Sequence, residues 1–360
     1  MTKKTKKTTI VDIARALKTS VTTVHRALSN HPHIKPATKV RVLKMAKKLN
    51  YRPNLAARYL SSRRRLRISI NTLQGRTSFW DEVRAGIDEE SRRLDLENVE
   101  LEFRTFPELG ESEEAAFGAA LSASVDGIIA YPSAPQSLNR MMRANEKPLP
   151  LVFVATDAPE TPRLTAVTID TKGSGYLAAD LMGRLLGGKG RVAVTMFDAQ
   201  IAEHAEKGSA FEEMIRRYYP GISVENPLED HDIEAIAYEK TCELISRCPD
   251  LAGIYVATEA SIPVIKAARE LRVLDRLTII STDLFPSLMK EIDAGSVTAT
   301  IYQRPRTQGR MAFRALYEYL VDGTCPPGRV SLAPHLVMRG NAASFLQKNS
   351  EDGADASLGD

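Results

Sequence analysis

Positive charge is concentrated at the N-terminal end of this 360-residue chain. Residues 1–67 hold 19 lysines and arginines against a single acidic residue, Asp12, which gives a net charge of +18. The other residues hold 30 bases and 44 acids, because the whole chain has 49 and 45, and their net charge is −14. Such a division predicts a head that binds a polyanion, followed by an acidic body. A solvated basic tail is the alternative.

The basic segment has the apolar periodicity of three short helices. The apolar residues that repeat at helical spacing are Ile10, Ile13 and Leu17, then Val24 and Leu28, then Val42, Ala46 and Leu49. Thr9 and Ser20 stand where the first two helices need N-caps, and Pro36 fits the first position of the third. Two short helices joined by a tight turn and closed by a third predict a helix-turn-helix head, whose second helix enters the DNA major groove.

The second predicted helix, residues 21–28, turns several side chains away from that apolar stripe. Arg26 suits guanine, because its planar guanidinium matches two acceptors on that base. Val21 can pack on a thymine methyl group, and Thr22 and Thr23 can meet bases or phosphates. We therefore predict that this helix reads the DNA sequence.

Residues 50–60 follow the three helices and could form only about two helical turns. A helix that short is marginal alone in water and needs a partner to persist. Ala56 and Ala57 allow the close approach of a second copy, and Leu60 offers an apolar wedge of the kind that enters the minor groove. The polar run at residues 61–65 favours a plain linker instead. Both interpretations hold if the helix becomes ordered only on DNA.

Residues 8–60 resemble the DNA-binding head of the lactose-repressor (LacI-type) family. The resemblance rests on the stretches Thr9-Ile-Val-Asp-Ile-Ala14, Ser20-Val-Thr-Thr-Val-His-Arg26 and Asn50-Tyr-Arg-Pro-Asn-Leu-Ala-Ala-Arg-Tyr-Leu60. It implies that Val21, Thr22 and Arg26 read bases and that Leu60 from two hinge helices opens a central base step. The residues expected to contact DNA are Thr9, Ser20, Val21, Thr22, Thr23, His25, Arg26, Asn30, Tyr51, Asn54, Ala57 and Leu60.

The head departs from the family pattern at three positions. Lys18 stands in the turn where the family usually has Gly, so a left-handed backbone there would be strained. Lys35 precedes the third helix in place of a Ser-type cap. His25 replaces a small polar residue on the reading helix, which leaves either a phosphate contact or an altered base preference open.

From residue 66 onward, short β-rich runs alternate with amphipathic stretches in two passes. The predicted strands are 66–71, 99–103, 127–131, 151–155, 166–169, 191–195, 253–257 and 278–282, and the predicted helices are 79–94, 111–124, 172–186 and 203–217. This alternation predicts parallel sheets covered by helices, and two passes predict two such domains. The expected fold is an all-α helix-turn-helix head followed by an α/β core of two doubly wound parallel-sheet subdomains.

The body, residues 67–344, resembles the periplasmic-binding-protein-like core that this family shares with sugar-binding proteins. We expect a head at 1–50, a hinge helix and linker at 51–66, and a disordered acidic tail at 345–360. Within the core, residues 67–164 with 285–302 are expected to form one subdomain, and residues 165–284 with 303–344 the other.

Ligands of open α/β sheets bind beyond the carboxyl ends of the strands. Trp80 there could stack on a sugar ring or serve as a core aromatic, and Asp283 could accept from ligand hydroxyls or cap the helix after Pro286. The resemblance places Phe79, Trp80, Lys207 and Asp283 at ligand-contacting positions. Lys207 replaces the usual Arg and could instead be solvated, and Glu259 stands in the place of the usual Asn-Asp pair. The expected ligand-binding residues are Phe79, Trp80, Lys207, Glu259, Asp283 and Gln303.

Competing functions have weaker support in the sequence. The Gly-rich run at residues 187–190 follows a helix and precedes a strand, which is the reverse of a phosphate-binding loop. There is no Gly-x-Ser-x-Gly elbow and no paired-His metal motif, so we expect no enzyme, no cofactor and no metal site. His31 and His33 could bind a metal, but a polar loop between helices is the favoured interpretation. A transport-type sugar-binding protein would need an apolar signal segment, and residues 10–15 carry charges instead.

The sequence thus predicts a transcriptional regulator that binds specific DNA, with repression as the favoured mode. We expect it in the cytoplasm, associated with the nucleoid, because the three cysteines do not suggest a disulfide framework and no apolar run is long enough to span a membrane. We also expect a pseudo-palindromic operator, because one reading helix spans too few base pairs for specificity and two-fold symmetry supplies the second half-site. Between a dimer and a tetramer, the lack of a leucine heptad after the core favours a homodimer. A sugar or sugar derivative in the interdomain cleft is expected to control operator affinity.

Overall fold

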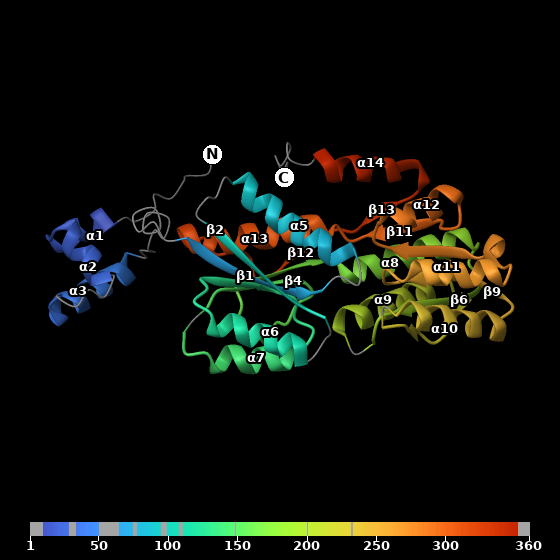
Figure 1. Ribbon diagram of the computed structural model, residues 1–360, viewed down its shortest axis with the longest axis horizontal. Helices are drawn as coiled ribbons and strands as arrows, with labels where there is room; N and C mark the ends of the chain where they lie inside the picture. Colours follow the sequence, from blue (N-terminus) through green and yellow to red (C-terminus); the bar gives the residue numbers. More distant parts are fainter. Residues whose placement is uncertain are drawn as a thin grey trace. The chain divides into compact units, whose positions relative to one another are not determined.

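The computed structural model describes residues 10–28, 34–49, 65–74, 78–94, 99–107, 111–147, 149–199, 201–231 and 233–351 (Figure 1). The chain divides into two compact units. One comprises residues 1–64 with 318–325, and the other comprises residues 65–317 with 326–360. The predicted hinge, at residues 51–66, falls almost wholly outside the described residues.

The N-terminal unit contains the three predicted helices, drawn in blue in Figure 1: α1 (Ile10–Leu17), α2 (Val21–Leu28) and α3 (Pro36–Lys48). Their shared core consists of Ile13, Ala14, Val24, Ala27, Val42 and Ala46. Ser20 caps α2, because its hydroxyl accepts a hydrogen bond of 3.1 Å from the backbone N–H of Thr23. The turn before it is left-handed at Lys18, where φ is 50°, so the expected strained backbone is present.

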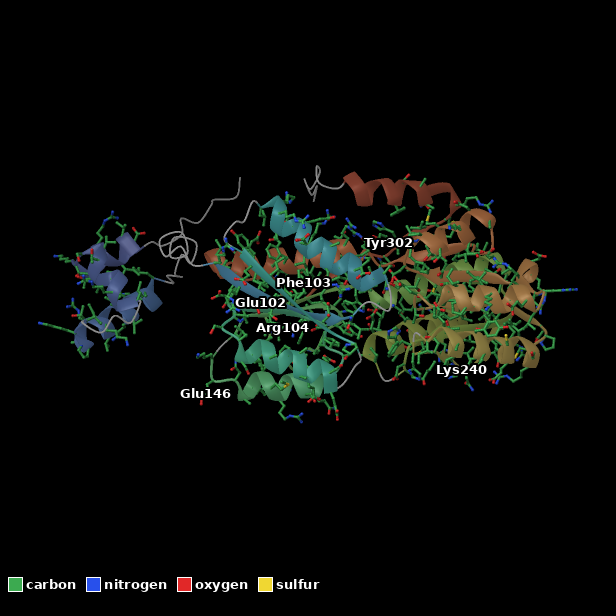
Figure 2. All side chains as sticks on the ribbon, in the orientation of Figure 1. Glu102, Phe103, Arg104, Glu146, Lys240 and Tyr302 are labelled. Carbon is green, nitrogen blue, oxygen red and sulfur yellow. The ribbon has the colours of Figure 1, made fainter. Side chains whose placement is uncertain are left out.

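The second unit contains two parallel sheets. The first sheet has the strand order β12-β5-β4-β3-β1-β2. These strands are β1 (Leu66–Leu73), β2 (Val99–Phe106), β3 (Gly127–Ala130), β4 (Leu151–Ala155), β5 (Thr165–Ile169) and β12 (Val330–Leu332). Every residue of β3, β4 and β5 is buried, as is typical of central strands in a sheet covered on both faces. The outer strand β2 exposes Phe103 (labelled in Figure 2) between charged neighbours.

Helices cover both faces of the first sheet. Figure 1 shows α6 (Glu111–Ser122) and α7 (Pro135–Ala144) on one face, and α5 (Ser78–Arg93) and α13 (Pro305–Asp322) on the other. Helices α5 and α13 touch backbone to backbone. A Cβ atom at Gly86 would come within 2.0 Å of the Arg306 carbonyl oxygen, and one at Gly309 would come within 2.1 Å of the Val83 carbonyl oxygen.

The second sheet has the strand order β13-β11-β10-β9-β6-β7, with β8 also paired to β6. These strands are β6 (Lys189–Met196), β7 (Gly221–Val224), β8 (Leu228–Glu229), β9 (Leu251–Val256), β10 (Thr278–Thr282), β11 (Ala299–Tyr302) and β13 (His335–Val337). All these pairs are parallel except that of β11 with β13.

Two apolar clusters lie against opposite faces of this sheet. One face packs against α8 (Thr171–Leu185) and α9 (Ala202–Tyr218). The other packs against α10 (Glu234–Arg247), α11 (Ser261–Glu270), α12 (Pro286–Ala294) and α14 (Arg339–Glu351), with a short 3-10 turn at Leu274–Arg276 before β10. One of the helices on the first face, α9, contributes residues to the candidate ligand site.

The division of the core into halves corrects the predicted one. Strand β5 pairs with β4 in the first sheet, whereas residues 165–169 were expected in the second half. Strand β11 lies in the second sheet, whereas residues 285–302 were expected in the first, and α13 and β12 pack with the first sheet. The chain therefore passes between the sheets after β5, after β11 and after β12. Strands β5 and β11 each stay beside the strand that precedes them in the chain, β4 and β10, whereas β12 returns to pair with the distant β5.

The predicted disordered tail is also corrected in part. Helix α14 continues to Glu351, and Phe345 packs edge-on against Tyr302 (labelled in Figure 2), with ring centroids 5.9 Å apart. Phe345 also packs against His335, and the polar composition of the segment alone did not reveal these contacts. Residues 352–360 lie outside the described residues.

The contact between α5 and α13 gives a prediction about stability. The substitution Gly309→Ala should lower the free energy of unfolding by about 1–3 kcal/mol, because the added methyl group meets backbone that cannot move aside. In a free helix the same change would stabilise by about 1 kcal/mol. The matched control is Gly118→Ala in α6, where the methyl group meets only the flexible end of Met141 at 3.2 Å. Urea unfolding followed by circular dichroism measures both, and equal effects would contradict the close contact.

Candidate functional sites

The surface of α2 presents the residues predicted to read DNA. Thr22 and Arg26 are exposed, and Val21 is 40% exposed although it is apolar. The hydroxyl groups of Ser20 and Thr23 are hydrogen-bonded to each other, with 2.8 Å between the oxygens, at the N-terminal end of the helix. The remaining predicted DNA contacts, Thr9, Asn30, Tyr51, Asn54, Ala57 and Leu60, lie outside the described residues, as does the side chain of His25.

A pocket lies in the second unit, at the carboxyl ends of strands from both of its sheets. The first sheet and its loops contribute Leu73, Phe79, Trp80, Tyr131 and Ala155, and the second contributes Phe197, Glu203, His204, Lys207, Ala257, Thr258, Glu259, Asp283 and Gln303. It encloses about 580 Å³ of empty space, part of it open to solvent. The structure thus brings all six predicted ligand-binding residues together, and their role in binding stays a prediction.

Aromatic rings form one wall of the pocket. Trp80 meets Phe79 edge to face, with centroids 4.9 Å apart, and meets Tyr131 at 4.6 Å with a tilt of 54°. Only 6% of Trp80 is exposed. The two sequence interpretations of Trp80 are therefore compatible, because the ring packs in the core and also lines the pocket. Tyr131 was not predicted, since nothing before the fold places the end of β3 beside the start of α5.

Lys207 is buried against the pocket rather than solvated. Its side chain is 1% exposed, its ammonium group forms an ion pair of 3.0 Å with Glu203, and it donates at 3.4 Å to the carbonyl oxygen of Ala257. Burial lowers the pKa of Lys207, but the charge of Glu203 and its hydrogen bond, together with Tyr255 and Asp283, offset this and the net pKa is raised. Burial likewise raises the pKa of Glu203, and Lys207 brings it below its usual value. Glu203 was missed, although its spacing of four residues before Lys207 is a recognisable helical ion-pair signal.

Asp283 and Gln303 form a second polar pair. The carboxylate of Asp283 accepts hydrogen bonds from the backbone N–H of Gln303 at 3.1 Å and from its side-chain amide at 2.7 Å. Asp283 is 3% exposed and has a left-handed backbone with φ of 65°. The alternative that Asp283 caps the next helix is wrong, because α12 has Phe285 at its N-cap and no side-chain cap.

Burial raises the pKa of the Asp283 carboxyl group to about 6, although the hydrogen bonds from Gln303 and the charge of Lys207 act in the opposite direction. A buried carboxyl group with a raised pKa destabilises the folded state at neutral pH. Such groups are concentrated at functional sites, where ligand chemistry rather than folding keeps them.

Glu259 links the loops of the two sheets across the pocket. Its two carboxylate oxygens accept from the backbone N–H and from the hydroxyl group of Ser78, each at 2.8 Å. Ser78 is the first residue of α5, where backbone N–H groups have no partner within the helix. Glu259 thus satisfies a helix end that belongs to the other sheet. Ser78 was not predicted, although a serine just before the aromatic pair is a plausible helix start.

The described residues were also considered for a metal site and for a membrane-spanning helix. Among these residues, no group of three or more His, Cys, Asp or Glu side chains is arranged to hold a metal ion. Within the same part of the chain, no helix is both long enough and apolar enough to cross a membrane.

Comparison with known proteins places the two units in known families. Residues 9–54 match the family model described as bacterial regulatory proteins of the lacI family, and residues 69–324 match that of a periplasmic binding protein domain. The chain belongs to the lacI family of bacterial regulatory proteins, with a periplasmic binding protein domain as its core. Proteins of this family are DNA-binding transcriptional regulators, and the resemblance stated from the sequence is confirmed.

Full-length regulators are among the relatives. The chain is 26% identical over 342 residues to catabolite control protein A of Priestia megaterium, covering 91% of this chain and 97% of that protein. It is 25% identical over 341 residues to the HTH-type transcriptional regulator DegA of Bacillus subtilis, covering 92% and 97%.

Solved sugar-binding proteins share the fold of the core. GanP, a glucose-galactose binding protein from Geobacillus stearothermophilus, aligns with a TM-score of 0.70 at 23% identity over 77% of this chain and 98% of its own. A solute-binding protein from Burkholderia graminis in complex with D-arabinose aligns with a TM-score of 0.73 at 21% identity, over 78% and 98%.

The raised pKa of Asp283 predicts a pH dependence of stability. Between about pH 4 and pH 6 the unfolded chain releases this proton before the folded chain does, so wild-type stability falls as the pH rises through that range. The loss amounts to a few kcal/mol at most, since one pKa unit corresponds to about 1.4 kcal/mol. Asp283→Asn removes the titrating group, so its stability should fall less across the same range.

Urea midpoints at a series of pH values measure this difference. The matched control is Asp275→Asn, which makes the same exchange at an exposed residue before β10 and should keep the wild-type slope. Parallel pH profiles for Asp283→Asn and the wild type would show that Asp283 titrates as an ordinary carboxyl group.

Proposed function

We propose that this regulator binds a pseudo-palindromic operator as a homodimer, and that a small polyhydroxylated molecule in the core pocket changes its operator affinity. The carrying observation is that one chain joins a basic head exposing Arg26 and Val21 to a core whose pocket gathers aromatic and charged groups. No catalytic step and no cofactor enter this function. We place the protein in the cytoplasm at the nucleoid, where its DNA would be.

The DNA-binding half of the proposal rests on α2. An exposed apolar residue beside an exposed arginine, on a helix of a strongly basic unit, suits direct readout of thymine methyl groups and guanine edges. One such helix spans too few base pairs to be specific, so we infer two heads related by two-fold symmetry. Leu60 from each copy would enter the minor groove between them.

The effector half of the proposal rests on the composition of the pocket. Aromatic faces such as Trp80 stack on sugar rings, and carboxylate and amide groups such as Asp283 and Gln303 accept and donate to hydroxyl groups. GanP and the arabinose-bound protein bind sugars on the same fold. A ligand that touches residues of both sheets favours one orientation of the two halves. A coupling of about 1–3 kcal/mol, or about 5–150-fold in affinity, would serve a genetic switch.

A non-regulatory solute-binding protein is the alternative, and the core alone would suit it. The lacI-type head favours the regulator, because a transported-sugar receptor has no use for a base-reading helix. A titration with duplex DNA separates the two, since only the regulator prefers specific duplexes to random ones.

The DNA half is tested by Arg26→Ala. We expect a loss of about 1–3 kcal/mol at one base pair of each half-site, because the guanidinium no longer pairs with guanine. The measurement is fluorescence anisotropy on an operator selected from a random duplex library and on base-pair variants of it. The matched control is Arg15→Ala on α1, a 77% exposed arginine of the same head that removes the same charge. An equal loss on selected and random duplexes would mean that Arg26 contacts only phosphate.

The hinge is tested by Leu60→Ala. The variant should bind the operator more weakly and bend it less, while ligand affinity is unchanged, because the wedge acts only within the minor groove. Energy transfer between dyes at the two duplex ends reports bending. Leu271→Ala, at a 40% exposed leucine of the core, is the control for loss of an exposed leucine. Unaltered bending by Leu60→Ala would reduce residues 50–60 to a linker.

A further inference from the structure

The charged groups that line the pocket do not balance. Among the described residues of its lining, three carboxylates, Glu203, Glu259 and Asp283, face a single cation, Lys207. His204 does not add a second cation, because burial and the charge of Lys207 lower the pKa of its imidazole to about 4. At neutral pH the lining therefore carries a surplus of negative charge in a place largely removed from water.

Two of the three carboxylates already have a positive partner within the chain. Glu203 is paired with the ammonium group of Lys207 at 3.0 Å, helped by the more distant charge of Arg329. Glu259 lies on the N-terminus of α5 through its two bonds to Ser78, and a helix N-terminus carries a partial positive charge. These two partnerships use the cationic groups that the pocket offers.

Within the part of the chain that the structure describes, the hydrogen-bond donors to the Asp283 carboxylate are neutral. Both of its oxygens accept from Gln303, once from the backbone and once from the amide, and neither of these groups carries a charge. The charge of Lys207 lowers the pKa of Asp283 from a distance, while two of the three ammonium hydrogens go to Glu203 and Ala257. A buried carboxylate without a cationic partner is costly, and the raised pKa of Asp283 is the expected consequence.

The backbone around Asp283 holds this residue in its place in the pocket lining. Its left-handed backbone is held by the bond from its N–H to the carbonyl oxygen of Ile301 at 3.0 Å and by Thr300, whose hydroxyl group donates to the Asp283 carbonyl oxygen. Strained backbone of this kind persists where the surrounding structure fixes it, most often at functional sites.

The aromatic wall supplies a second preference for positive charge. Phe79, Trp80 and Tyr131 line the same pocket as Asp283, and the faces of aromatic rings attract cations. A neutral sugar would use the stacking surface and the hydrogen bonds, but it would leave the carboxylate surplus uncompensated.

We propose that the ligand of this pocket is a polyhydroxylated amine, such as an amino sugar, whose protonated amine pairs with Asp283. The inference rests on the proposed function, in which the pocket binds a small effector, and it adds the charge of that effector. It follows from the direct pairing of Lys207 with Glu203, which leaves Asp283 without a direct ion pair among the described residues.

The test compares amines with their parent sugars on the wild-type protein. Isothermal calorimetry at pH 7 and fixed ionic strength measures D-glucosamine, D-galactosamine and D-mannosamine against D-glucose, D-galactose and D-mannose. We expect at least one amine to bind about tenfold or more tightly than its parent, a ratio that corresponds to about 1.4 kcal/mol. If no amine binds more tightly than its parent, the inference is overturned.

A variant shows where the amine binds. Asp283→Asn keeps the size and one acceptor oxygen of the side chain and removes its charge, so it should abolish the preference for the amine while Asp275→Asn retains it. A preference that survives Asp283→Asn overturns the assignment to this residue. If Asp283→Asn does not fold, the wild-type comparison decides alone.

A separate measurement distinguishes this inference from the proposed function. The same saccharides are added to the complex of the protein with its selected operator duplex. A neutral hexose that binds as tightly as its amine and shifts operator affinity would overturn the amine inference and leave the proposed function standing. Failure of every saccharide in the panel to bind would count against both.

Discussion

The parallel arrangement of the strands is the constraint on which the rest of the core depends. Parallel neighbours must be connected by a crossover, so their carboxyl ends gather at one edge of each sheet. The chain passes between the sheets after β5, β11 and β12, and it thereby brings the carboxyl edges of both sheets to one pocket. Residues as distant as Leu73 and Gln303 meet there because each follows a strand. Backbone contact between α5 and α13 then fixes the last crossover helix on the first sheet.

The charges of the pocket are arranged by partners that come from different elements. Lys207 and Glu203 share α9, and their pair can form as soon as that helix does. Asp283 and Gln303 follow neighbouring strands, and Glu259 and Ser78 belong to different sheets. The three pairs thus join residues at increasing separations in the sequence: 4 residues for Glu203 and Lys207, 20 for Asp283 and Gln303, and 181 for Ser78 and Glu259. Whatever rearranges the two sheets will affect Glu259 and Ser78 first, because only that pair joins the two halves among these three.

Much of the fold and of the site could be predicted from sequence, because it depends on local pattern. Strands β4 and β10 have the predicted bounds: β4 is an uninterrupted apolar run, and β10 is a short β-rich run of Thr, Ile and Ser. The turn residue Lys18 has a left-handed backbone. The six predicted lining residues share a pocket because each stands after a strand. What failed was non-local. No short pattern tells that β12 returns to the first sheet beside β5, or that Ser78 meets Glu259, since each of these contacts joins residues more than a hundred positions apart.

The bonds between Ser78 and Glu259 also bear on how large a response a ligand can produce. A ligand shifts an equilibrium between two orientations only by the difference between its affinities for them. Two hydrogen bonds of 2.8 Å, one of them from a backbone N–H at a helix start, already favour the orientation in which the sheets meet. Each net bond to a charged group contributes about 1.5–3 kcal/mol, comparable to a whole allosteric coupling of about 1–3 kcal/mol. On the proposed function, the chain's own contacts would therefore set the resting balance of the two halves, and an effector would adjust that balance.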